Sequence, residues 1–153
     1  MDVKYINPFL AATINVLKIM AGVELRPGKP YLKKDAVAVG DVSGIIGITG
    51  DVTGSLSVSF SFGLIKKIMK NMLQEELTDI TEDARDAVGE ITNMICGDAR
   101  RMLEENGLKL SAAIPTIIAG RKHTIKHAVS GPIIVIPFEE KSGIAVVEVS
   151  MKN

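Results

Sequence analysis

A strict alternation of serine with large apolar residues over positions 55–61 is the feature that most constrains how this chain folds. Leu56, Val58 and Phe60 occupy every second position, and serines stand between and beside them. Because successive side chains of a strand point to opposite faces of a sheet, the alternation predicts a strand with one apolar face and one small, polar face. The chain is therefore expected to contain a β-sheet.

A hairpin is predicted directly before that strand. Residues 45–49 have the composition of another strand, and the connecting residues 50–54 read Gly-Asp-Val-Thr-Gly. Glycine and aspartate tolerate the positive φ angles of tight hairpins, so these two strands are expected to pair. Residues 26–30, with two prolines and a glycine, are expected to form a loop. The other predicted strands cover residues 36–39, 112–119, 133–138 and 144–149, with a hairpin glycine at position 143.

Three segments have apolar residues at helical spacing. The first covers residues 6–20 and is expected to stop at Gly22, and the second covers residues 64–73. The third and longest helix is expected to begin at Thr81, whose hydroxyl suits an N-cap, and to end near Gly107.

Each half of the chain shows the same order of elements, a helix followed by three strands with a glycine at the last hairpin. Residues 16–22 align with residues 91–97, although few residues are identical. We therefore predict an α/β (α+β) fold in a single domain spanning residues 1–153, with pseudo-twofold halves of one helix and three strands each. Strands of both halves would share one sheet, and the helices would pack on a face of it.

Composition argues against several classes of protein. The 18 basic and 18 acidic residues give a net charge of zero and a pI of about 6.7, so no overall basic field attracts nucleic acid or an acidic membrane. A single cysteine, Cys96, cannot form an internal disulfide, and no apolar run approaches the roughly 18 residues of a membrane span. The N-terminus lacks the pattern of a signal peptide, so we expect a cytoplasmic protein.

The long helix carries a polar stripe opposite its apolar face. Spacings of four, three, four and three residues place five residues on one side of the helix: Asp86, Glu90, Asn93, Gly97 and Arg100. Most such stripes are simply solvated. However, Asp86 and Glu90 are like charges one turn apart, which is unfavourable unless a cation approaches. Gly89 and Gly97 each cost about 0.8–1.0 kcal/mol relative to alanine in a helix, so a strand or a docked partner is expected there.

Other candidate residues carry weaker signals. His123 and His127 have the i,i+4 spacing of helical metal ligands, but the basic residues around them would repel a cation. Residues 121–126 are expected to form a solvated hairpin or edge rather than a nucleic-acid site, because no aromatic residue is present for stacking. Cys96 is expected to be a packed thiol, since no histidine adjoins it in sequence, and the methionines are expected to fill the core.

The motif Asp86-x-x-x-Glu90-x-x-Asn93, followed by Met-Ile-Cys-Gly at residues 94–97, resembles the helix motif of the CheC/CheX/FliY family of chemotaxis phosphatases. The Asn-Pro-Phe sequence at residues 7–9 and the predicted hairpin are similar to those of the CheX branch. The resemblance covers most of the chain.

The resemblance implies a phosphatase that hydrolyses the aspartyl phosphate of a CheY-like response regulator, without a covalent enzyme intermediate, to end a chemotaxis signal. By this likeness Glu90 and Asn93 are catalytic: Glu90 pairs with the conserved lysine of the receiver domain, and Asn93 orients the attacking water. Such chemistry requires positioning and charge stabilisation above all. Asp86 and Gly97 are candidate partner-binding residues. The family also implies a homodimer and no cofactor or metal of its own, because Mg²⁺ belongs to the receiver.

One departure from the family pattern bears on the number of sites. CheC-like relatives carry the motif in both halves, whereas the aligned positions of the first helix hold Asn15 and Lys18, so one site per chain is expected. Residues 133–136 and 144–147 are apolar on both strand faces, which favours a homodimer with shared sheet edges or strands. Two alternatives stay open: a non-catalytic module that binds a receiver or a flagellar-switch component, and a structural dimerisation domain.

Overall fold

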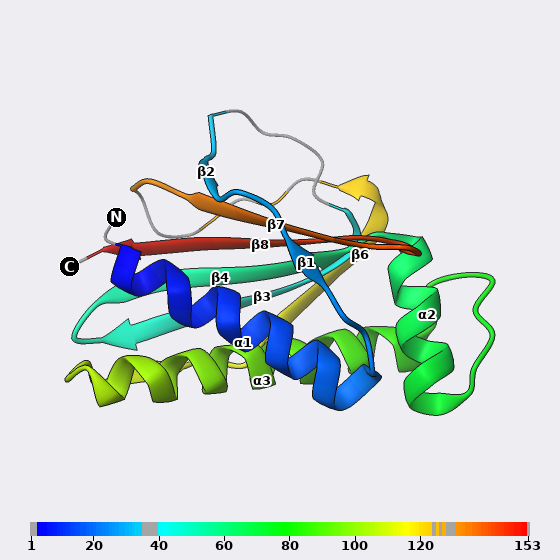
Figure 1. Ribbon diagram of the computed structural model, residues 1–153, viewed down its shortest axis with the longest axis horizontal. Coiled ribbons are helices and arrows are strands. Elements are labelled where there is room, and N and C mark those ends of the chain that lie inside the picture. The colour runs from blue at the N-terminus through cyan, green and yellow to red at the C-terminus, as the bar shows by residue number, and fades with distance from the viewer. Residues whose placement is uncertain (1–2, 35–39, 124, 126, 128–130, 153) are drawn as a thin grey trace.

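The computed structural model describes residues 3–34, 40–123, 125, 127 and 131–152. The helices in this part of the chain are α1 (Val3–Ala21), α2 (Phe62–Leu73) and α3 (Glu82–Glu105). The strands form one antiparallel sheet, with α1 and α3 across one face of it and α2 at one end (Figure 1). No helix in the described ranges combines the length and apolar character of a membrane span.

The order of the strands is symmetric about the centre of the sheet. In chain order the strands are β1 (Arg26–Pro27), β2 (Tyr31–Leu32), β3 (Gly40–Gly50), β4 (Thr53–Phe60), β5 (Leu110–Ala112), β6 (Thr116–His123), β7 (Ile134–Glu140) and β8 (Gly143–Lys152). Strands β4 and β8 pair at the centre, with β3 beside β4 and β7 beside β8. β1 and β2 then pair with β7 of the other half, and β5 and β6 pair with β3. This exchange confirms the predicted fold, in which both halves contribute strands to one sheet.

Each half supplies four pairing segments, where the sequence predicted three. The predicted strand at residues 112–119 is divided into β5 and β6 around Pro115, which has no backbone N–H to donate to the ladder. The predicted loop at residues 26–30 begins with the two residues of β1, and the Gly28 N–H donates to the Pro137 carbonyl at 2.8 Å. The strand expected at residues 36–39 lies outside the described residues.

Local sequence accounts for the ends of the helices. Thr81 Oγ1 accepts a hydrogen bond from the Ala84 N–H at 3.1 Å and caps α3, as predicted. Gly22 follows α1 with a φ of 61°, and Gly107 follows α3 with a φ of 92°. Both angles favour glycine. The observed bounds of α1, α2 and α3 lie close to the expected ones, so all three predicted helices are confirmed.

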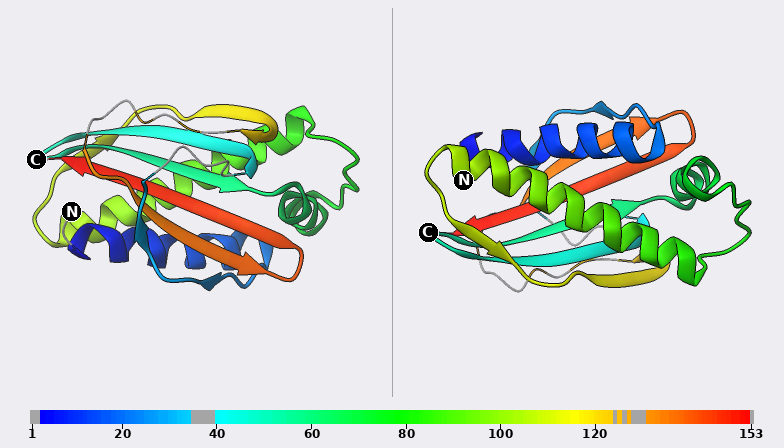
Figure 2. Two further views of the ribbon diagram at one scale, coloured as in Figure 1. Left: turned by 90° about the horizontal axis from the view of Figure 1, so that it is seen from above. Right: turned by 90° about the horizontal axis from the view of Figure 1, so that it is seen from below.

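The two faces of the sheet differ in character. Large apolar side chains fill the face that α1 and α3 cover, where the two helices also pack against each other (Figure 2). The opposite face carries the serines of β4, as the alternation predicts. These serines are nevertheless buried, because Ser55, Ser57 and Ser59 are at most 3% exposed. The outer face of the sheet over β4 is therefore buried as well as polar, and not a solvated surface.

Candidate functional site

Helix α3 carries the predicted site residues, and its buried side determines where they lie. The apolar residues at helical spacing on one side of α3 are Ala84, Val88, Ile91, Ile95 and Met102; the first four are buried and Met102 is partly buried. They pack against α1 and the strands of the sheet. Thr92 is also buried, and its hydroxyl donates to the Val88 carbonyl at 2.7 Å within the same helix. The site thus stands on a helix whose opposite side is embedded in the core.

Two arginines attach α3 to the neighbouring strands. Arg85 Nη2 donates to the Ile117 carbonyl of β6 at 3.5 Å, and Arg100 Nη1 donates to the Leu110 carbonyl of β5 at 3.0 Å. Both arginines are half-buried. Arg100 belongs to the predicted stripe by its spacing, but its long side chain reaches back and donates to a strand carbonyl.

The other residues of the predicted stripe lie on the accessible side of α3. Asp86, Glu90 and Asn93 are exposed, and Gly97 is partly exposed. We call these four residues the α3 stripe. The side chains of Glu90 and Asn93 form no hydrogen bond or ion pair with any other described residue. The carboxylate can therefore accept a cation from outside, and the amide one turn later offers both a donor and an acceptor.

The two interior glycines of α3 have different surroundings. A Cβ placed on Gly89 would lie 3.5 Å from Ile117 Cδ1 of β6, which is an ordinary packing distance. A Cβ placed on Gly97 would meet no atom within 4 Å. The close approach to Gly89 therefore comes from a strand of this chain, whereas the side of Gly97 is open to a partner.

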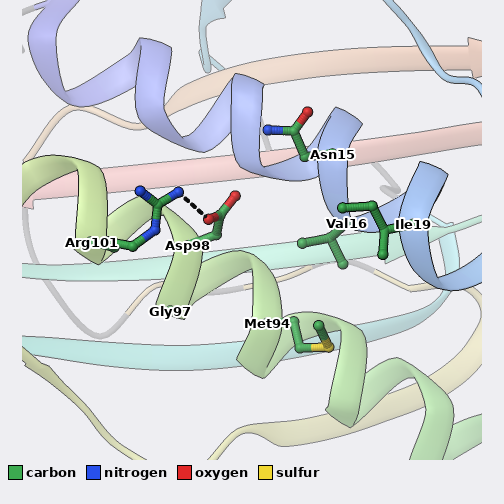
Figure 3. Close-up of a pocket in the computed structure, with 7 residues that line it drawn as sticks. All are labelled: Asn15, Val16, Ile19, Met94, Gly97, Asp98 and Arg101. Atoms are coloured by element: carbon green, nitrogen blue, oxygen red, sulfur yellow. Dashed lines mark hydrogen bonds and ion pairs between the residues drawn. The ribbon is translucent and has the colours of Figure 1, made fainter.

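A groove between α1 and α3 adjoins the stripe (Figure 3). It has a volume of about 390 Å³, and its lining consists of Asn15, Val16, Ile19, Met94, Gly97, Asp98 and Arg101. Ile19 is 80% exposed and Met94 is 38% exposed. The prediction that the methionines fill the core is therefore wrong for Met94. Asn15, one of the two residues that replace the motif in the first helix, lies on the opposite wall from Met94. The groove was not predicted from the sequence. The signal would have been Ile19, an apolar residue of the first helix that lies outside the spacing of its core-facing residues and is exposed in the structure.

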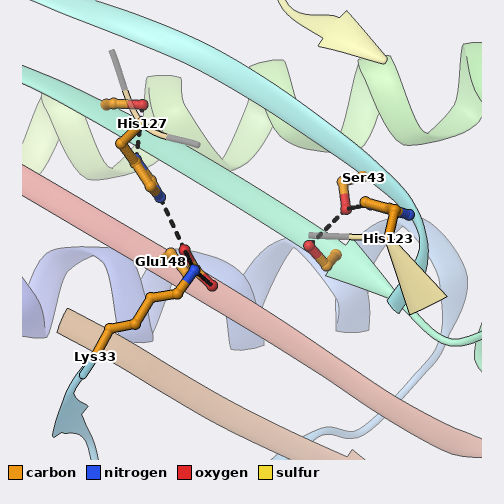
Figure 4. Close-up of polar contacts among 7 residues, drawn as sticks. Lys33, Ser43, His123, His127 and Glu148 are labelled. Carbon is orange, nitrogen blue, oxygen red and sulfur yellow. Dashed lines mark hydrogen bonds and ion pairs between the residues drawn. The ribbon is translucent and has the colours of Figure 1, made fainter. Parts of the chain in front are cut away.

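A buried ionic group lies on the outer face of the sheet (Figure 4). Lys33 Nζ donates to both Glu148 carboxylate oxygens, at 3.0 and 3.1 Å. His127 Nε2 lies 2.9 Å from Glu148 Oε1, and His127 Nδ1 lies 3.0 Å from Ser55 Oγ. The side chains of Glu148 and His127 are each 1% exposed. Burial alone would raise the pKa of the Glu148 carboxyl, but the hydrogen bonds and charges of His127 and Lys33 outweigh it and lower the pKa.

A second group of hydrogen bonds continues this layer along the sheet. His123 Nε2 lies 2.6 Å from Ser43 Oγ, which in turn lies 2.6 Å from Ser59 Oγ. We call the combined set the outer-face cluster: Lys33, Ser43, Ser55, Ser59, His123, His127 and Glu148. The two histidines thus bond to different partners, and His123 ends a strand, so the helical metal-ligand spacing does not apply. The expectation of a solvated hairpin or edge at residues 121–126 is confirmed in part: Arg121 is exposed on β6, which pairs only with β3 among the described strands, whereas Ile125 is 6% exposed.

Cys96 is a packed thiol, as expected. The residue is 1% exposed, and burial raises the pKa of its thiol to about 11 even though Arg100 opposes the shift. At neutral pH the thiol is therefore protonated and enclosed, which makes it a poor nucleophile.

The side chains of the α3 stripe can position a water molecule or a partner's cationic group, but they offer no nucleophile. An amide neither titrates nor attacks, yet it can hold a water molecule at a fixed place. The carboxylate can bind a cationic group of a second molecule. No cluster of three or more His, Cys, Asp or Glu side chains suited to a metal occurs in the described residues. The arrangement therefore suits a reaction whose reactive group is brought by a partner.

Comparison with known proteins agrees with this chemistry. The family model for the chemotaxis phosphatase CheX matches residues 42–139. CheY-P phosphatase CheX of Thermotoga maritima is 30% identical over 138 residues, which are 90% of this chain and 88% of that protein. Chemotaxis protein CheX from Vibrio vulnificus is 47% identical with a TM-score of 0.92, over 97% of this chain and 99% of that one. A chain of the CheX–CheY–BeF3–Mg²⁺ complex from Borrelia burgdorferi is 27% identical with a TM-score of 0.81, over 97% and 98%. The chain therefore belongs to the CheX family of chemotaxis phosphatases.

Proposed function

We propose that this chain accelerates hydrolysis of the aspartyl phosphate on a CheY-like receiver domain and so ends a chemotaxis signal. The observation that carries the proposal is that Glu90 and Asn93 are exposed on α3 and that their side chains have no partner among the residues that the structure describes. Family membership supplies the substrate class, because a relative 30% identical is named a CheY-P phosphatase. The whole of residues 1–153 would act as one phosphatase domain.

In the proposed reaction, α3 lies against the receiver, and the two residues have separate roles. Glu90 pairs with a receiver lysine and fixes the register of the two proteins. Asn93 holds a water molecule in line with the phosphorus. The water oxygen forms a bond to phosphorus while the bond from phosphorus to the aspartate oxygen breaks, which gives inorganic phosphate and a free carboxylate. The chain forms no covalent intermediate, and its contribution is positioning.

The receiver supplies the remaining charge stabilisation in this proposal. Mg²⁺ would arrive bound to the receiver, and the Borrelia burgdorferi complex contains Mg²⁺ together with CheY. Asp86 lies one turn before Glu90 on the exposed side of α3, where it would extend the negative surface offered to the receiver. Gly97 would let the receiver approach closely beyond Asn93, since nothing of this chain occupies that space.

We further propose that the protein is a cytoplasmic homodimer joined through sheet edges or strands. Strand β6 pairs with β3 on one side, and it lies at the margin of the sheet within the described residues. Ile114, just before β6, is 89% exposed, and Ile144 of β8 is 48% exposed. Burying such groups against a second copy would remove them from water. Light scattering at micromolar concentration should give twice the mass of the chain, and a monomer would contradict this part.

The experiment that tests the phosphatase proposal is the decay of a phosphorylated CheY-like receiver with and without catalytic amounts of this protein. The receiver is phosphorylated with a small phosphodonor, and release of phosphate is followed after the donor is removed. Faster decay with repeated turnover supports the proposal. Binding to the phosphorylated receiver with unchanged decay would instead support a non-catalytic binding module.

A further inference from the structure

Strand β3 touches α3 at the turn that carries Glu90 and Asn93. Gly44 lies on the helix-facing side of β3, and the buried Thr92 side chain rests directly on its backbone. A Cβ placed on Gly44 would overlap Thr92 Oγ1 and would lie 2.9 Å from Thr92 Cβ. Real Cβ atoms do not approach this closely, so any side chain at position 44 must displace something.

Thr92 cannot move aside without cost. Its hydroxyl donates to the Val88 carbonyl at 2.7 Å, and its side chain is completely buried. A different rotamer would break that hydrogen bond in a place where water cannot replace it. Close packing of the surrounding core also leaves little space for the methyl group. The response that remains is a movement of the helix away from the strand.

The attachments of α3 locate that movement at the proposed catalytic turn. Arg85 holds the helix to β6 and Arg100 holds it to β5, through the carbonyls described above. Thr92 lies seven residues after the first arginine and eight before the second, almost midway between them. A side chain at position 44 would therefore displace the middle of α3, while the hydrogen bonds of Arg85 and Arg100 hold the helix on either side of it.

We propose that Gly44 and Thr92 are positioning residues that set the height of the Glu90–Asn93 turn above the sheet, and hence the place of the attacking water. This inference rests on the proposed phosphatase function. A displacement of about 1 Å can reduce a rate by about a hundredfold when catalysis depends on alignment. Docking depends on a wider surface, so it should change much less.

The test is a double-mutant cycle of Gly44→Ala and Thr92→Ala, with receiver-phosphate decay measured at saturating receiver and at temperatures where every variant is folded. Gly44→Ala should lower kcat at least tenfold, with KM changed less than threefold. Gly44→Ala combined with Thr92→Ala should be faster than Gly44→Ala alone but slower than the wild type, because the overlapping hydroxyl is gone while the Cβ of residue 92 remains 2.9 Å from the new methyl group. Gly47→Ala is the matched control on the same strand, since a Cβ there meets nothing within 4 Å, and it should keep kcat within twofold.

Each outcome separates the two proposals. An inactive wild-type protein overturns the phosphatase function and this inference with it. An active wild type together with a Gly44→Ala kcat within twofold overturns the positioning role alone. A Gly44→Ala variant whose lost rate is not even partly recovered by Thr92→Ala also contradicts it, because the loss would then not come from the contact between these two residues. If Gly44→Ala does not fold, Thr92→Ala alone should lower kcat at least threefold at unchanged KM, and an unchanged kcat contradicts the proposal.

Discussion

The α3 stripe and the outer-face cluster lie on opposite sides of the sheet, and they differ in whether their polar groups already have partners. Glu90 and Asn93 are exposed, and their side chains bond to no described residue. Glu148 and His127 are enclosed and bond to each other. The outer-face cluster even contains a serine, a histidine and a glutamate in hydrogen-bonded order, the residue types of a hydrolytic triad.

Access distinguishes the two regions more clearly than residue type does. A nucleophile needs a place for its substrate, and Ser55 is 3% exposed beneath the layer that contains His127. Lys33 and His127 both bond to the buried Glu148 carboxylate, so we expect these three residues to contribute to the stability of the fold. Among the described residues, the side chains of Glu90 and Asn93 have no such internal partners, which supports the proposal that the α3 stripe binds another molecule.

Of the substitutions that distinguish the outer-face cluster from the α3 stripe, Glu148→Ala is expected to have the largest effect, a loss of unfolding free energy. Removing the carboxylate leaves Lys33 and His127 without their shared partner in a buried place, at a cost of about 3–5 kcal/mol of unfolding free energy. Glu139→Ala is the matched control on the neighbouring strand, because Glu139 pairs with Arg26 at 4.0 Å and both side chains are about 70% exposed. It should cost less than about 1 kcal/mol. Urea unfolding measures both, and equal losses would contradict the assigned roles.

Glu90→Ala should leave stability almost unchanged and should weaken receiver binding and turnover. Stability should change by less than about 0.5 kcal/mol, because Glu90 is exposed and has no described partner. Affinity for a receiver bound to Mg²⁺ and beryllofluoride, a mimic of the phosphorylated state, should fall at least tenfold, since a receiver lysine loses its partner. Turnover should fall as well. Glu104→Ala, an exposed glutamate near the end of the same helix, should leave affinity unchanged. A loss as large as that of Glu90→Ala would indicate a general charge effect.

Gly97→Leu tests whether the open side of α3 is a docking surface. Leucine is the better helix former, and nothing within 4 Å opposes a Cβ at this position, so the variant should be at least as stable as the wild type. A bulky side chain one turn past Asn93 should hold the receiver away and weaken its binding severalfold. Gly97→Ala should weaken it less. Calorimetric titration measures both variants, and unchanged binding of the leucine variant would place the receiver elsewhere.

Acid should weaken the outer-face cluster in a defined direction. The pKa of Glu148 is lowered from the ordinary value of 4.5 in the folded protein, because the bonds from His127 and Lys33 outweigh the opposing effect of burial. The stabilisation from this carboxylate is therefore fully present above pH 4.5 and is lost as the pH falls through the folded pKa. The unfolding free energy of wild type and Glu148→Gln, compared from pH 6 to pH 3, should converge in acid. A constant difference would contradict the lowered pKa.

Sequence periodicity was sufficient for the three helices, for strands β3, β4, β7 and β8, and for the spacing of the stripe, because these depend on which side of a helix or strand a residue occupies. The alternation at Leu56, Val58 and Phe60 and the spacing of Glu90 and Asn93 are local patterns of this kind. Periodicity could not show that the serine face is covered, since the residues that enclose Glu148 come from positions 33 and 127. Nor could it show that Arg100 turns back to a strand carbonyl, which depends on the position of β5. These features are set by contacts between distant segments.

The roles given to Glu90 and Asn93 are distinguished most directly by Asn93→Ala, with turnover and affinity measured on the same receiver. Losing a group that positions the attacking water should slow phosphate release at saturating protein by about a hundredfold. Affinity for the beryllofluoride-bound receiver should change by no more than about 0.5–1.5 kcal/mol, the net worth of one hydrogen bond. That combination is the result we predict. Wild-type decay rates in Asn93→Ala would contradict the catalytic assignment and leave α3 as a binding surface only.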